Sequence, residues 1–102
     1  MQVTEHNVTS FKISDVPALD PVRVYFDDEP DSKGSITITC YGQSWCSFFN
    51  SMGAGNNVKS FISGCDVDYL VNRMLNPKST KRDIAYLTRI IHAVKEAIKV
   101  FP

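Results

Sequence analysis

The sequence predicts an α+β fold: an antiparallel meander of three or four strands, then two short helices and one long C-terminal helix packed on the sheet. Two observations lead to this prediction. The first half of the chain alternates apolar and polar residues, whereas the second half places apolar residues three and four positions apart. Because the chain has 102 residues, we expect one domain over residues 1–102.

Runs rich in β-branched residues and separated by turn residues predict the strands. These runs cover residues 8–16, 21–26, 35–42 and 45–52. The polar stretch DDEPDSKG, residues 27–34, is expected to form the turn of an antiparallel hairpin. A second turn, from Gly42 to Ser44, is expected to bring the fourth run back onto the third.

Three amphipathic stretches predict the helices. They cover residues 58–65, 67–75 and 84–101. Asn56 or Asn57 is expected to cap the first helix, and Asp66 to cap the second. Thr80 followed by Asp83 resembles a capping box at the start of the last helix, although Glu or Gln is more usual at the second position.

Composition and charge narrow the class of protein. Eleven basic residues balance eleven acidic ones, which argues against a general nucleic-acid coat. Residues 1–52 hold three basic and seven acidic residues, whereas residues 53–102 hold eight basic and four acidic residues, so the molecule is expected to have an acidic and a basic end. No apolar run is long enough for a membrane helix, and no secretory signal is visible, so we expect a cytoplasmic protein.

The stretch CYGQSWCSFFNSMGAG raises the question of a reactive or metal site. A cysteine nucleophile needs a base within hydrogen-bond distance, and the only histidines are His6 and His92. Structural zinc sites gather Cys and His in closely spaced pairs, which Cys40, Cys46 and Cys65 do not form. We therefore expect three reduced thiols and no catalytic residue, cofactor or metal; an enzyme built on Cys46 and His92 is the less favoured alternative.

The aromatic residues of the same stretch leave two alternatives. Tyr41, Trp45 and Phe49 fall on one face of the predicted strands. If that face is turned away from the helices, the three side chains form a protein interface, for a partner or for a homodimer, since Trp and Tyr are typical interface anchors. If the N-terminal segment covers that face, the same residues are core.

Two charged groups are further candidates. The acidic group is expected in the hairpin turn, where it could contribute to a protein interface: Asp27, Asp28 and Glu29. The basic group lies at the start of the last helix, where backbone N–H groups also favour anions: Lys78, Lys81 and Arg82. It is the best candidate for nucleic-acid binding, although a solvated helix start is the simpler interpretation.

Several motifs resemble a known group of proteins. CYGQSW with the nearby MG, then DYLVNRM and YLTRII, resemble small accessory proteins of tailed bacteriophages and prophages, over residues from about Pro21 to Lys99. The resemblance implies no activity and no site residue. It implies a context: a non-enzymatic phage protein in the bacterial cytoplasm that binds and blocks a host or defence protein, as anti-CRISPR proteins and inhibitors of the host recombination nuclease do. A small nucleic-acid-binding phage protein is the alternative.

Overall fold

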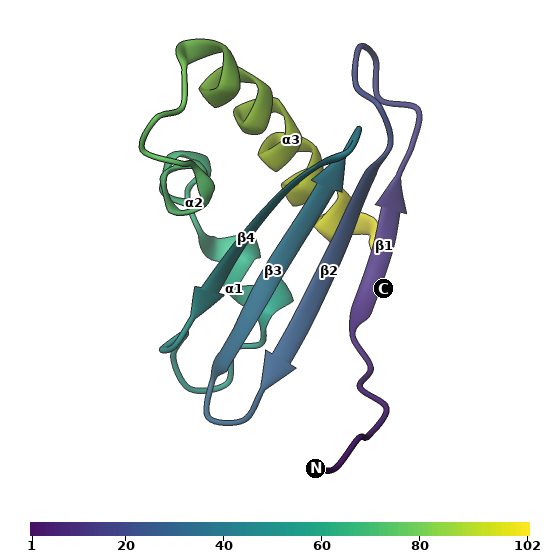
Figure 1. Cartoon of the computed structure of the whole chain (residues 1–102), viewed down its shortest axis with the longest axis vertical. Helices are drawn as coiled ribbons and strands as arrows, with labels where there is room; N and C mark the ends of the chain where they lie inside the picture. Colours follow the sequence, from purple (N-terminus) through teal and green to yellow (C-terminus); the bar gives the residue numbers. More distant parts are fainter.

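The structure, a computed structural model, describes residues 1–102 and has two layers, a four-stranded sheet and three helices (Figure 1). The strands are β1 (Thr9–Ile13), β2 (Val22–Glu29), β3 (Lys33–Cys40) and β4 (Gln43–Phe49). The helices are α1 (Val58–Gly64), α2 (Val67–Met74) and α3 (Lys81–Val100). The predicted α+β fold is confirmed.

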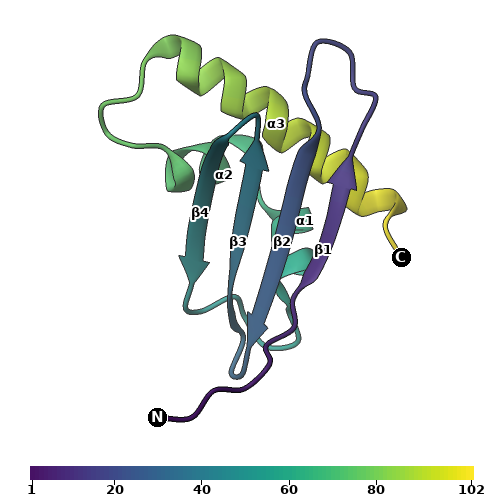
Figure 2. The ribbon, with the colours of Figure 1, turned by 45° about the vertical axis from the view of Figure 1, so that its right-hand side comes forward.

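The sheet is an antiparallel meander in the order β1-β2-β3-β4. Each strand pairs with its neighbour in the sequence, so that Val24 lies opposite Phe11 on one side and Ile38 on the other. The helices all lie on one face of the sheet, and α3 crosses the strands obliquely (Figures 1 and 2). The other face is uncovered, as antiparallel sheets allow when that face is polar.

The core lies between the sheet and the helices and contains 18 buried residues. Period-two alternation sends alternate residues of β2 and β3 into it: Val22, Val24, Phe26, Ile36, Ile38 and Cys40. The stripe of α3 that was predicted from helical spacing is buried against them: Leu87, Ile90, Ile91, Val94 and Ile98. The long helix therefore covers the sheet because its apolar stripe and the apolar face of the strands exclude water together.

The turn between β2 and β3 is shorter than predicted. The loop contains only Pro30, Asp31 and Ser32, and the last two have positive φ angles of 65° and 57°. The expectation that residues 27–34 form the turn is therefore wrong, because the strands continue past the apolar alternation. Backbone pairing needs no apolar side chain, so the polar residues of β2 keep pairing to the end.

The turn between β3 and β4 contains two residues, Tyr41 and Gly42, with φ angles of 49° and 77°. Positive φ at both positions is the geometry of a type I′ hairpin turn. The turn includes Gly42, as predicted, but it does not extend to Ser44. The two-residue turn pairs Cys40 with Gln43 and Ile38 with Trp45, so Trp45, Ser47 and Phe49 lie on the inner face with Ile38.

All three helices begin at a predicted cap residue, and two of these residues make the capping hydrogen bond. The Asn57 side chain accepts from the Ser60 backbone N–H, and Thr80 and Asp83 form the reciprocal bonds of a capping box. Asp66 occupies the N-cap position of α2 but makes no side-chain cap hydrogen bond.

Candidate functional site

The structure turns two of the three candidate aromatic residues toward the helices. Phe49 is buried at 3 % exposure and packs on the Phe61 ring of α1, with the ring centroids 5.0 Å apart. Trp45 is half-buried against Tyr86 of α3, at 5.9 Å between centroids. Only Tyr41 is exposed, at 78 %, because it lies in the hairpin turn. Of the two alternatives, a shared outer face for the three residues does not occur. Trp45 and Phe49 belong to the core, although the helices cover them and not the N-terminal segment.

The acidic group is distributed over two faces of β2. Asp28 points toward the helices, where its Oδ1 atom accepts from the Val58 backbone N–H of α1 at 2.7 Å. Asp27 points the other way and lies 2.8 Å from the ring Nε2 of His6. Glu29 is exposed at the end of β2, opposite Lys33. Asp28 therefore stabilises the start of α1, whereas Asp27 and Glu29 remain on the surface.

The uncovered side of the sheet, which we call the outer face, consists of the residues between the buried ones. They form cross-strand rows: Lys12, Arg23, Thr39 and Ser44; Ser10, Tyr25, Thr37 and Cys46; Asp27, Ser35 and Phe48. Phe48 is 48 % exposed and lies two strands away from Asp27. Basic residues therefore gather at one end of the outer face, and Phe48 shares the opposite end with a carboxylate.

The basic group at the start of α3 is exposed. Lys78 lies in the loop before α3, and Lys81 and Arg82 lie in the first turn of that helix. Two other basic residues that could have joined them contact other parts of the molecule. Arg73 of α2 donates to Ser47 Oγ and to the Phe48 carbonyl of β4, and Lys59 of α1 donates to the Phe101 carbonyl.

The three cysteines lie in different environments. Cys40 is buried, where its Sγ donates to the Asp20 carbonyl and accepts from the Tyr86 hydroxyl at 3.2 Å. That hydrogen bond is the main cause that raises the pKa of Tyr86 to about 12, and desolvation adds to it. Burial raises the pKa of the Cys65 thiol, although Lys95 opposes the change. Cys46 is exposed on the outer face.

His92 lies on the other side of the sheet from the exposed Cys46 thiol. His92 is exposed on α3, which covers the inner face of the sheet, whereas Cys46 projects from the outer face. His6 is held by Asp27. No group of three or more His, Cys, Asp or Glu side chains is placed to hold a metal ion. No helix combines the length and the apolarity needed to cross a membrane.

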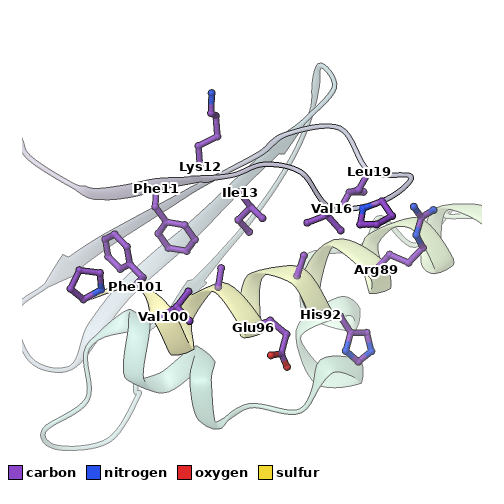
Figure 3. A pocket seen from close by; sticks show the side chains of 14 residues that line it. Phe11, Lys12, Ile13, Val16, Leu19, Arg89, His92, Glu96, Val100 and Phe101 are labelled. Carbon is purple, nitrogen blue, oxygen red and sulfur yellow. The ribbon is translucent and has the colours of Figure 1, made fainter.

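A second surface feature is an apolar groove of about 750 Å³ between β1, the segment that follows it, and the second half of α3 (Figure 3). Its lining is mostly apolar: Phe11, Ile13, Val16, Leu19, Ala93, Ala97, Val100 and Phe101. Lys12, Arg89, His92 and Glu96 also border it. Phe101 closes one end by packing on Phe11, with 4.7 Å between the ring centroids.

Sequence reasoning missed both Phe48 and the groove. The signal for Phe48 was present, because a two-residue turn after Cys40 places Phe48 opposite the outward Ser35. The groove had no local signal, since it joins residues 11–19 to residues 89–102.

The comparisons with known proteins agree with the phage context. A phage family, Phage_phiTE_072, matches residues 1–98, and the chain belongs to this family. No curated protein and no solved structure matches the chain.

Proposed function

We propose that this phage protein is a non-enzymatic accessory protein that binds and inhibits a host or bacterial defence protein, of the anti-CRISPR or anti-nuclease type, in the bacterial cytoplasm. The observation that supports the proposal best is the outer face, where Tyr25 lies between the basic and the acidic row and the exposed Phe48 shares the acidic row. Exposed aromatic residues with a charged border are typical of protein interfaces. Membership of a phage family supplies the biological context.

The balance of charge on the outer face favours a protein partner over a nucleic acid. Lys12 and Arg23 lie at one end, whereas Asp27 and Glu29 at the other end exceed the single Lys33 by one charge. A polyanion would be attracted to the first pair and repelled by the second, whereas a protein surface of complementary pattern gains from both. Tyr41 extends this interface beside the basic end, while Trp45 and Phe49 support it from the core.

The surroundings of the thiols support a role without catalysis. A cysteine enzyme would need Cys46 beside a histidine, but His92 lies on the opposite side of the sheet. Cys65 is half-buried with a raised pKa, so that little of it is thiolate near neutral pH.

The test is affinity capture from a host lysate with the wild-type chain, the Phe48→Asp variant and a matched control. Ile84→Asp is the control, because Ile84 is an apolar residue of similar exposure, 42 %, on α3. We expect the wild type and the Ile84→Asp variant to capture and inhibit one stoichiometric partner, and Phe48→Asp to lose most of that capture. Absence of a stoichiometric partner, or equal capture by Phe48→Asp, would refute the proposal.

A second candidate function is nucleic-acid binding by Lys78, Lys81 and Arg82. It is favoured by their exposure and by the absence of any ion pair to them. This function predicts salt-dependent retention of DNA or RNA that disappears when all three residues are replaced by Ala. Retention that survives the triple replacement would contradict it.

A further inference from the structure

The groove lies beside a sheet edge whose hydrogen-bonding groups are free. β1 pairs only with β2, and no backbone or side-chain hydrogen bond reaches residues 9–13 from outside the sheet. The opposite edge is different, because Arg73 of α2 donates to the Phe48 carbonyl of β4. Natural proteins usually cover or charge a free edge, since such an edge accepts another strand. β1 is therefore the edge at which a further strand fits.

The segment before β1 is an extended arm that makes little contact with its own molecule. Residues 1–8 are all exposed, and their one side-chain contact is between His6 and Asp27. Val3 is 86 % exposed, and the arm runs away from the sheet (Figure 2). The arm leads into β1 without a turn, so it does not pair with the free edge of its own β1.

We propose that the N-terminal arm of a second copy of this chain pairs antiparallel with β1 and fills the groove, so that two copies exchange arms in a symmetric dimer. The inference is independent of the proposed function, because the groove and the outer face are different surfaces. The twofold axis passes beside Asn7, so each residue of one arm pairs with a residue of the other copy, and the two residue numbers of a pair add up to fourteen. Val3 then lies opposite Phe11, and Met1 opposite Ile13.

The side-chain pattern fits this register. In β1 the odd-numbered residues Phe11 and Ile13 face α3 and line the groove. Strand geometry places every second residue on one face, so the odd-numbered Met1 and Val3 of the partner's arm face the same groove. The even-numbered position opposite Lys12 is Gln2, so the pairing brings no like charges together. The interface is isologous, and each copy fills the other's groove.

The first test compares two valines of the arm that lie on opposite faces of the proposed strand. Sedimentation of the full chain at about 100 μM, where even a micromolar dimer is nearly complete, should give a dimer. Val3→Asn should weaken it by at least about tenfold, because each dimer loses two apolar contacts. Val8→Asn is the matched control, since Val8 lies in the same arm but on the other face, and it should leave the affinity unchanged. A monomeric wild type, or equal effects of the two variants, would overturn the proposal.

The second test fixes the register with a disulfide in a Cys46→Ser background. Paired residues of antiparallel strands have Cα atoms about 4.5–5.5 Å apart, which suits a disulfide. Asn7→Cys places the new thiol opposite its own copy, so mild oxidation should link nearly all chains into dimers. Thr4→Cys lies opposite Ser10 and should remain largely unlinked. Equal linkage by the two variants would show that the arms do not pair in this register.

Discussion

Gly34 is the residue at which β3 and α1 approach most closely. A Cβ atom at this position would lie 2.5 Å from Val58 Cγ2 and 2.7 Å from the Asp27 carbonyl oxygen. Val58 is fully buried and the second neighbour is backbone, so neither can move without disturbing the packing. The missing side chain is therefore what allows α1 to lie on the hairpin.

We predict that Gly34→Ala lowers the free energy of unfolding by about 1–3 kcal/mol, the usual cost of overpacking. The measurement is urea denaturation. Gly64→Ala is the control, because a Cβ atom there has no neighbour within 4 Å. Equal stability of the two variants would contradict the close approach at Gly34.

Tyr86 makes stability depend on pH in the alkaline range. Its hydrogen bond to Cys40 and its burial raise its pKa from the ordinary value of 10 to about 12. The folded state therefore holds the phenol proton more tightly than the unfolded state. This contribution to stability is complete below pH 10 and is lost as the pH rises through the folded pKa of about 12.

Tyr86→Phe should accordingly lower stability at neutral pH by about 1 kcal/mol, the typical net value of a hydrogen bond. Its stability should fall less steeply than that of the wild type between pH 10 and pH 12. Denaturant titrations at several pH values measure both effects. Parallel pH profiles of the two proteins would contradict the role of the Tyr86 phenol.

At the scale of elements, Arg73 joins α2 to the edge of the sheet. It donates to Ser47 Oγ and the Phe48 carbonyl, and its guanidinium lies 5.0 Å from the centroid of the Phe49 ring. Arg73 thus supplies a hydrogen-bond partner for the hydroxyl of the buried Ser47 and blocks part of the β4 edge. This contact fixes how α2 lies against β4.

Replacing Arg73 by Ala should lower the free energy of unfolding by about 1–3 kcal/mol, because a buried hydroxyl loses its partner. It should also increase aggregation on storage, since the β4 edge becomes free. Urea denaturation and light scattering measure these effects. Arg82→Ala, which removes an exposed arginine that forms no ion pair, should change neither. A stable, non-aggregating Arg73→Ala protein would contradict this account.

The elements could be predicted from the sequence where local chemistry decides them. The stripe of α3, the capping box of Thr80 and Asp83, and the alternation of β2 and β3 are local patterns, and the structure has all of them. The turn before β4 is one residue shorter than expected, and its length decides which β4 side chains face the helices. Aromatic residues occur on both faces, Phe48 and Phe49, so composition could not show which one is buried.

The candidate site was less predictable, since it depends on contacts between distant segments. The assignment of Asp27, Asp28 and Glu29 to one loop failed because β2 continues through them, which separates Asp28 from the other two. The groove brings β1 and α3 together, and no pattern within either segment indicates the space between them.

At the scale of the whole molecule, the three thiols report different degrees of opening. Cys46 is exposed, Cys65 is half-buried with a raised pKa, and Cys40 is buried in the core. Native-state alkylation should therefore modify Cys46 first and Cys65 more slowly. Cys40 should react only at the rate of global unfolding, because it lies in the shared core.

Mass spectrometry of peptides from timed alkylation measures the three rates. In strong denaturant the three rates should converge, which is the control for intrinsic reactivity. Native labelling of Cys40 as fast as that of Cys46 would contradict the buried position of Cys40.

The contact between Phe11 and Phe101 has a consequence for synthesis on the ribosome. The two residues are distant in the sequence, yet their rings are 4.7 Å apart. At a bacterial elongation rate of roughly 5–20 residues per second, Phe11 emerges several seconds before Phe101 exists. Throughout that interval the Phe11 ring lacks its C-terminal partner, and the nascent chain presents this part of β1 to chaperones and to neighbouring nascent chains.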